Sequence, residues 1–157
     1  MLANSVPNFV DDVPWGYLTA TIPAIVGVIG AFWYNQRLAR IKTAIELHAE
    51  FHEQSFIASR IAADAVLKTH LGSNPATIDS IYAATKDDEK TWPHVSRVLH
   101  FFERLSVLRK KRLVNRKTCD ALFRGYIAYY KQNYFDRLSA EHPDWQPLVR
   151  ALKRLPT

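Results

Sequence analysis

The chain has 157 residues, with 21 Lys and Arg against 15 Asp and Glu, and a formal net charge of +6. Its single cysteine, Cys119, excludes an internal disulfide framework and agrees with a reducing compartment. Only five glycines occur. Because no strand-like alternation or Asn-Gly turn signal appears, the sequence predicts an almost wholly helical protein.

Residues 1–14 contain two prolines and show no helical periodicity, which predicts a short outer tail. Residues 15–34 carry no charged side chain. A helix that rises about 1.5 Å per residue crosses a hydrocarbon layer of roughly 30 Å with about twenty residues. We therefore expect residues 15–34 to form a transmembrane helix. A buried core helix is the alternative, but a soluble chain of this size rarely makes a helix that is apolar on every side.

The charges are distributed unevenly about this predicted span. Residues 1–34 hold two acids and no Lys or Arg, whereas residues 35–157 hold all 21 Lys and Arg against 13 acids, a net charge of +8. Cations mark the cytoplasmic flank of a span, so we expect the N-terminus outside and the domain 35–157 in the cytoplasm. The side chains expected at the two membrane interfaces are Trp15, Tyr17, Trp33, Tyr34, Arg37 and Arg40.

From Asn35 to Leu71 no Gly or Pro interrupts the chain, and apolar residues recur at helical intervals. We expect the span to continue as one long helix, whose apolar stripe is covered by later helices or by a second copy. Four shorter helices are predicted at about 75–84, 92–111, 116–137 and 145–155, with Thr91, Asn115 and Asp144 capping the last three. The predicted fold is all-α: one N-terminal transmembrane helix continuing into a long helix, followed by a small cytosolic helical bundle.

His48 and His52 lie four residues apart in the stretch HAEFHE and would share one helix face, as two metal ligands must. The order is not the HExxH of zinc proteases, because Glu50 is rotated away from the pair. A metal site would also need a third ligand from another helix. The candidates for that ligand are His94, His100 and Glu103. We favour the alternative, a pair of structural or solvated histidines and no metal or other cofactor.

Six cations occupy nine positions in RKKRLVNRK, residues 109–117, at a predicted turn. Such a cluster can bind the phosphate of an anionic lipid or a nucleotide, and near a membrane the lipid is the favoured ligand. We do not expect nucleic acid as a partner. The alternative is a solvated loop whose cations complement a helix C-terminus. The six candidate anion-binding residues are Arg109, Lys110, Lys111, Arg112, Arg116 and Lys117.

Small residues recur along the predicted span at Ala20, Ala24, Gly27 and Ala31. This spacing places them in one stripe, which would let two helix backbones approach closely. Small residues are also common in spans that do not associate. We expect self-association, or association with another protein of a membrane complex, because the predicted long helix beyond the span offers a second stripe.

Several motifs in the second half of the chain occur together in a known group of proteins. They are Leu99-His100-Phe101-Phe102-Glu103, the basic turn 109–117, Tyr126 with Tyr130, and Pro143 with Leu148 and Leu152. On these residues, 95–155 resembles a bacterial family of unknown function, whose short members have one N-terminal span and a helical cytosolic part. The resemblance implies a bacterial inner-membrane protein and carries over no catalytic residues. The chain departs from the family at 110–113, where relatives usually have Gly in the turn.

The features above predict a non-enzymatic, membrane-anchored helical interaction or scaffold protein, either self-associating or an accessory subunit of a membrane complex. This prediction rests on the span, the charge asymmetry and the lack of a convergent catalytic set. Two alternatives stay open: a metal-dependent enzyme that uses His48 and His52, and a sensor of anionic phosphate, in a lipid or a nucleotide, that uses the turn 109–117.

Overall fold

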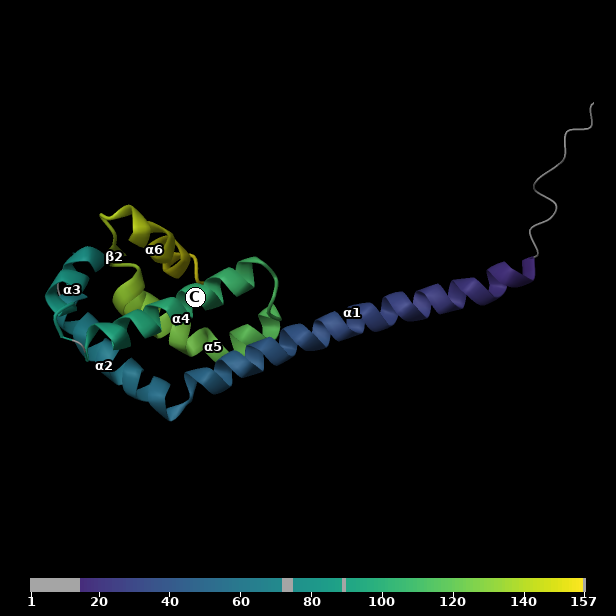
Figure 1. The fold of residues 1–157 in the computed structure, drawn as a ribbon, viewed down its shortest axis with the longest axis horizontal. Helices are drawn as coiled ribbons and strands as arrows, with labels where there is room; N and C mark the ends of the chain where they lie inside the picture. Colours follow the sequence, from purple (N-terminus) through teal and green to yellow (C-terminus); the bar gives the residue numbers. More distant parts are fainter. Residues whose placement is uncertain (1–14, 72–74, 89, 157) are drawn as a thin grey trace, which may run out of the picture. The chain divides into compact units, whose positions relative to one another are not determined.

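The computed structural model describes residues 15–71, 75–88 and 90–156. Within these residues it contains six α-helices, a π-helix, a 3-10 helix and two short strands, so the all-α class is confirmed (Figure 1). The chain divides into two units, Met1–Leu38 and Ala39–Thr157. The predicted outer tail, residues 1–14, lies outside the described residues.

The first helix, α1, runs from Trp15 to Phe51 and includes Pro23. The side chains of residues 15–22 lie outside the described part of the structure, and three predicted site residues, Trp15, Tyr17 and Ala20, are among them. Of the helices in the described residues, none has a stretch that is both long and apolar enough to cross a bilayer.

The predicted continuous helix from the span to Leu71 is wrong, because α1 ends at Phe51 and α2 runs from Gln54 to Leu71. The break brings two fully buried rings, Phe51 and Phe56, to 5.4 Å between centroids. On a straight helix, residues five apart point about 140° away from each other. The turn at His52 and Glu53 lets both rings enter one core, and this packing ends the helix without a Gly or Pro.

Later helices of the same chain cover the inner faces of α1 and α2 in the second unit. These are α4 (Trp92–Lys110) and α5 (Arg116–Tyr130), whereas α6 (Gln146–Lys153) packs on α4. The core is one continuous cluster that includes Leu47 and Phe51 of α1. Two of the apolar residues that recur in the stretch 35–71, Ile45 and Ile61, are not covered and are exposed at 54% and 68%. No second copy is therefore required to cover Leu47 and Phe51.

The two short strands were not predicted, because two residues are too few to show a periodic pattern. Strand β1 (Ala76–Thr77) pairs in parallel with β2 (Leu138–Ser139). Helix α3 (Ile78–Thr85) follows β1 directly, and Thr77 caps it by accepting a hydrogen bond from the Ser80 amide. After α5 the chain forms a π-helix, η1 (Lys131–Phe135), which leads to β2.

Of the three predicted helix caps, one is confirmed. The Asn115 side chain accepts a hydrogen bond of 3.0 Å from the Thr118 amide at the start of α5. Thr91 stands at the N-cap of α4, but its hydroxyl donates to Asp88 instead of capping the helix. Asp144 lies inside a 3-10 helix, η2 (Pro143–Trp145), whose N-cap is His142. The chain enters α6 through this extra turn, which moves Asp144 away from the cap position.

Candidate functional site

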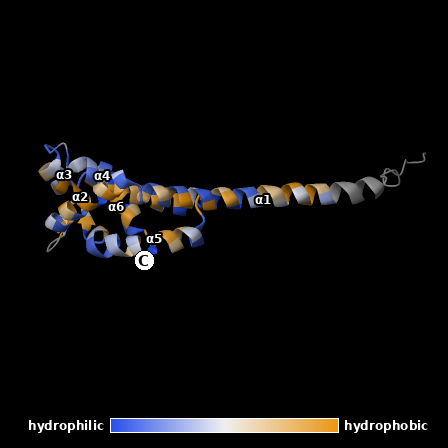
Figure 2. Ribbon diagram, turned by 90° about the horizontal axis from the view of Figure 1, so that it is seen from below, coloured by the Kyte–Doolittle hydropathy of each residue, from blue (hydrophilic) through white to orange (hydrophobic). Residues whose placement is uncertain are grey.

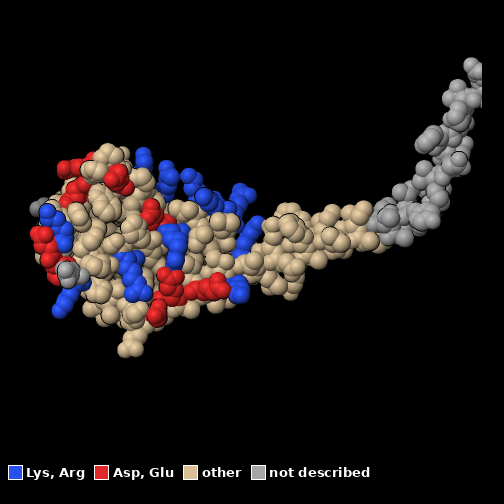
Figure 3. Space-filling view, in the orientation of Figure 1, with Lys and Arg blue, Asp and Glu red and all other residues tan. Residues whose placement is uncertain are grey.

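The described side chains of the predicted span, residues 23–34, are all exposed. They carry no charge: the ribbon of this part of α1 is mostly orange, hydrophobic, in Figure 2, and its visible face in Figure 3 bears no charged side chain. Val26 and Val28 are 64% and 71% exposed although they point about 160° apart around the helix. The further large exposed side chains here are Ile25, Ile29, Phe32, Trp33 and Tyr34.

The described members of the small-residue stripe lie on this same open surface. Ala24, Gly27 and Ala31 are exposed, and a Cβ added at Gly27 would meet no atom within 4 Å. A neighbouring helix backbone could therefore approach this side of α1 closely. Arg37 follows the apolar stretch and is also exposed, whereas Arg40 is half-buried and its carbonyl accepts from the Asn115 amide.

The structure brings His48 and His52 together, with ring centroids 4.3 Å apart. His48 packs against Phe123, and the Tyr126 hydroxyl lies 3.4 Å from Nε2 of His52. The pKa of His48 is lowered, mainly because the imidazole is partly buried and to a lesser extent because His52 is nearby. The two imidazoles are therefore part of the aromatic rim of the core.

The third ligands that a metal site would need are placed elsewhere. His94 Nδ1 lies 3.0 Å from the Ser59 hydroxyl, and His100 pairs with Glu103 at 2.9 Å. Among the described residues, no group of three His, Cys, Asp or Glu side chains could hold a metal ion. The arrangement therefore gives the metal-dependent alternative no support in the described part of the chain.

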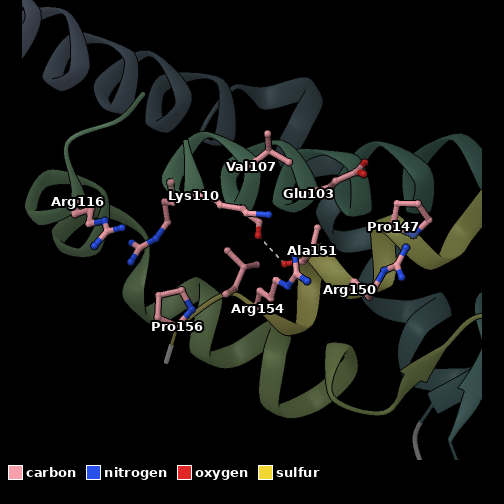
Figure 4. A pocket seen from close by; sticks show the side chains of 12 residues that line it. Glu103, Val107, Lys110, Arg116, Pro147, Arg150, Ala151, Arg154 and Pro156 are labelled. Atoms are coloured by element: carbon pink, nitrogen blue, oxygen red, sulfur yellow. Dashed lines mark hydrogen bonds between the residues drawn. The ribbon is translucent and has the colours of Figure 1, made fainter. Parts of the chain in front are cut away.

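A groove of about 840 Å³ lies between the end of α4, the start of α5 and α6 (Figure 4). Three of the six predicted anion-binding cations, Arg109, Lys110 and Arg116, line it. Two further cations, Arg150 and Arg154, come from α6 and its C-cap. Lys111, Arg112 and Lys117 are not among the lining residues. We call this feature the basic groove.

The cations of the basic groove fall into two kinds. Arg109 forms an ion pair with Asp120, and its side chain is only 13% exposed. Lys110, Arg116, Arg150 and Arg154 are exposed and form no ion pair with any described residue. Four cations therefore face the solvent beside a single acid, Glu103, which already pairs with His100.

The walls of the basic groove are held in place by buried contacts. The Ser106 hydroxyl of α4 donates a hydrogen bond of 2.7 Å to the Ala151 carbonyl of α6 (Figure 4). Cys119 of α5 is fully buried, and burial raises the pKa of its thiol. It is a small core residue, and it packs behind Arg109 instead of lining the groove.

The turn between α4 and α5 explains how the chain departs from the expected family pattern. Arg112 adopts φ 56°, the only positive φ of a non-glycine residue in the described chain. This left-handed conformation favours glycine. Arg112 thus stands in the turn 110–113 where the resemblance leads one to expect Gly, and it adopts the glycine-like conformation.

One cluster of polar side chains was missed by sequence reasoning. Asp64 of α2 accepts hydrogen bonds from Tyr129 and Tyr134. One turn away, the Arg60 guanidinium lies 4.2 Å from the Phe51 ring centroid, and its Nε is buried without a hydrogen-bond partner in the described structure. The sequence carried no signal for this cluster, because it depends on how α2 packs against the end of α5 and η1.

Comparison with known proteins gave one match. A family model described as "Domain of unknown function (DUF4760)" matches residues 18–139. No curated protein and no solved structure matches the chain. The predicted resemblance to a family of unknown function is thereby confirmed. The match includes the α4 and α5 walls of the basic groove but ends before α6.

Proposed function

The chain belongs to the DUF4760 family, and we propose that it is a membrane-anchored helical protein whose α1 places residues 15–34 in lipid. The observation that carries the proposal is the uncharged surface of residues 23–34, on which all the side chains are exposed. A folded protein partner would cover one side of such a helix, whereas lipid covers every side. In water, a continuous exposed apolar surface such as that of residues 23–34 is unfavourable in free energy.

The length of the uncharged sequence supports the same proposal. Residues 23–34 alone would rise about 18 Å, too short for a hydrocarbon core of roughly 30 Å. The charge-free residues 15–22 belong to the same helix, and together the twenty residues reach the required length. Trp33 and Tyr34, both exposed, stand where interfacial aromatic residues are expected.

The orientation and location form part of the proposal. Positive charge begins at Arg37, directly after the aromatic end of the apolar stretch. Because cations favour the cytoplasmic side, the second unit, Ala39–Thr157, lies in the cytoplasm of a bacterium and the N-terminus lies outside the inner membrane. The bilayer is then the first partner of this protein.

Within the membrane, we propose a non-enzymatic role as a self-associating or accessory subunit of a membrane complex. The open surface at Ala24, Gly27 and Ala31 supports close approach of a second helix. The second unit carries exposed apolar side chains, among them Ile45 and Ile61, that a protein partner could cover. A metal-dependent enzyme is not favoured, because the histidine pair has no third ligand among the described residues.

Charged substitutions in the apolar stretch test the anchor. Lys in the middle of a span costs about 2.5–3.5 kcal/mol on insertion scales. Val26→Lys with Ile29→Lys should therefore move the full chain from the membrane pellet to the alkaline wash. The matched control is Ile45→Lys with Ile61→Lys, which changes exposed apolar residues of the second unit and should leave the chain in the pellet. A wild-type chain that leaves the membrane in the same wash would overturn the proposal.

A further inference from the structure

The basic groove gathers five cations from three helices, and the last two of these cations lie more than thirty residues beyond the other three. Arg109 and Lys110 end α4, Arg116 begins α5, and Arg150 and Arg154 come from α6 and its C-cap. Arg109 is neutralised by Asp120. The other four have no ion-pair partner among the described residues. The basic groove therefore concentrates positive charge that no acidic side chain neutralises.

Helix dipoles account for only some of these cations. Lys110 and Arg150 lie in the last turns of α4 and α6, where a cation is favourable in any helix. Arg116 is the first residue of α5, where the positive end of the dipole repels a cation. A residue that breaks a local rule without compensation inside the fold marks a functional position. Arg116 is therefore the cation of the groove that the helix dipole does not explain.

The lining of the groove combines cations with apolar side chains, so it suits a ligand that carries an anionic group next to an apolar part. Val107, Pro147, Ala151, Leu155 and Pro156 supply apolar lining beside the cations. The Ser106 hydrogen bond to the Ala151 carbonyl fixes the spacing of α4 and α6 at the groove floor. Guanidinium groups match phosphate geometry because each offers parallel N–H donors. Three of the four uncompensated cations are arginines.

We propose that the basic groove binds a phosphate group that carries at least two negative charges, as a phosphomonoester or a diphosphate does. Lys110, Arg116, Arg150 and Arg154 supply the positive charge along the groove that attracts the phosphate oxygens, and the apolar lining receives the part of the ligand next to them. The same recognising chemistry serves a phosphate of a water-soluble compound and one of a lipid headgroup, and the experiment distinguishes these two sources. This proposal does not depend on the membrane anchor.

The test uses the full chain in neutral detergent and two probes. Inorganic pyrophosphate represents the soluble source, and short-chain phosphatidic acid represents the lipid headgroup. Each probe is titrated calorimetrically at low and high sodium chloride. We expect saturable binding of at least one probe, weakened by salt because ions screen exposed charges. The probe that binds identifies the source of the phosphate.

The variant Arg150→Glu with Arg154→Glu should weaken this binding by roughly tenfold or more, since charge-assisted contacts to phosphate become repulsive. The matched control is Lys68→Glu with Lys86→Glu, which reverses a last-turn cation of α2 and the C-cap cation of α3. The control has the same net charge as the groove variant, and it likewise removes two cations that interact favourably with helix C-termini. Because neither Lys68 nor Lys86 lines the groove, binding should stay within about twofold of wild type.

The circular dichroism spectra of both variants check that the helices persist. Binding of neither probe to the wild type, or an equal loss in the groove variant and the control, would overturn the basic groove as a phosphate site. The measurement is made in detergent, so its failure leaves the membrane anchor standing. Release of the wild-type chain from membranes would likewise leave the groove result unchanged.

Discussion

Tyr134 donates a hydrogen bond of 2.6 Å to Oδ1 of Asp64, the same oxygen that accepts a hydrogen bond of 2.8 Å from Tyr129. In an α-helix, residues five apart point about 140° away from each other. The π-helix η1 closes i to i+5 hydrogen bonds and so places Tyr129 and Tyr134 on one side. Their hydroxyl oxygens lie 3.5 Å apart. The π-helix thus ties the end of α5 to α2.

Removing the Tyr134 hydroxyl tests this tie. Tyr134 is buried, so Tyr134→Phe leaves Asp64 with one donor fewer and should lower the free energy of unfolding by about 1–3 kcal/mol. Tyr129 is 46% exposed, and its Phe variant should lose less because water replaces the missing partner. Urea unfolding of the full chain in detergent measures both. Equal losses would show that the π-helix gives Tyr134 no special role.

Alkaline pH should weaken the second unit through the same tyrosines. Burial raises the pKa of Tyr130, and burial with the Asp64 hydrogen bond raises that of Tyr134. Because these pKa values are raised in the folded state, the tyrosines do not lower the free energy of unfolding below pH about 10, the pKa of tyrosine in the unfolded chain. Above that pH the unfolded chain ionises first, so the free energy of unfolding falls. Tyr134→Phe should show a shallower fall than wild type, and an identical slope would contradict this origin.

Phe51 should be one of the most sensitive positions of the core. It is fully buried, and its ring contacts Phe56, Phe101, Phe123 and Arg60. Phe51→Ala should cost about 3–5 kcal/mol of unfolding free energy because a cavity remains. Ile61→Ala, at a position 68% exposed, is the control and should change stability by less than about 0.5 kcal/mol. Similar losses of unfolding free energy in the two variants would contradict the burial of the Phe51 ring in the core.

Self-association through the small-residue stripe predicts a steric effect. Gly27→Leu should dissociate a dimer in detergent, because its side chain would keep two helix backbones apart. Gly30→Leu is the matched control, since residue 30 lies about 90° from the centre of the stripe. Sedimentation of the full chain reports the mass of the complex. A wild-type monomer, or equal dissociation in both variants, would remove the stripe as an interface.

Local signals in the sequence predicted local structure well. The all-α class follows from helical periodicity and scarce glycine, and the Asn115 cap follows from its short polar side chain before an amphipathic stretch. The break after Phe51 could not be predicted, because no Gly or Pro marks it. It exists because Phe51 and Phe56 enter one core, and such packing overrides local propensity.

The sequence predicted only the part of the basic groove that is local in the chain. The cluster at 109–117 is visible as a run of cations, but the structure keeps only Arg109, Lys110 and Arg116 in the groove. Arg150 and Arg154 lie more than thirty residues further along the chain, and only the packing of α6 on α4 brings them there. The Asp64 cluster has the same origin, since a π-helix leaves no mark in the pattern.

The proposed anchor brings lipid into contact with every side of the apolar stretch of α1. Ile25, Val26 and Val28 point in three directions around this helix, and none of them lies at the centre of the small-residue stripe. Each is changed to Cys in a Cys119→Ala background, labelled with a fluorophore and placed in bilayers whose lipids carry a quencher near the midplane. The proposed anchor predicts strong quenching at all three positions. Quenching at none of them, or on one side only, would contradict it.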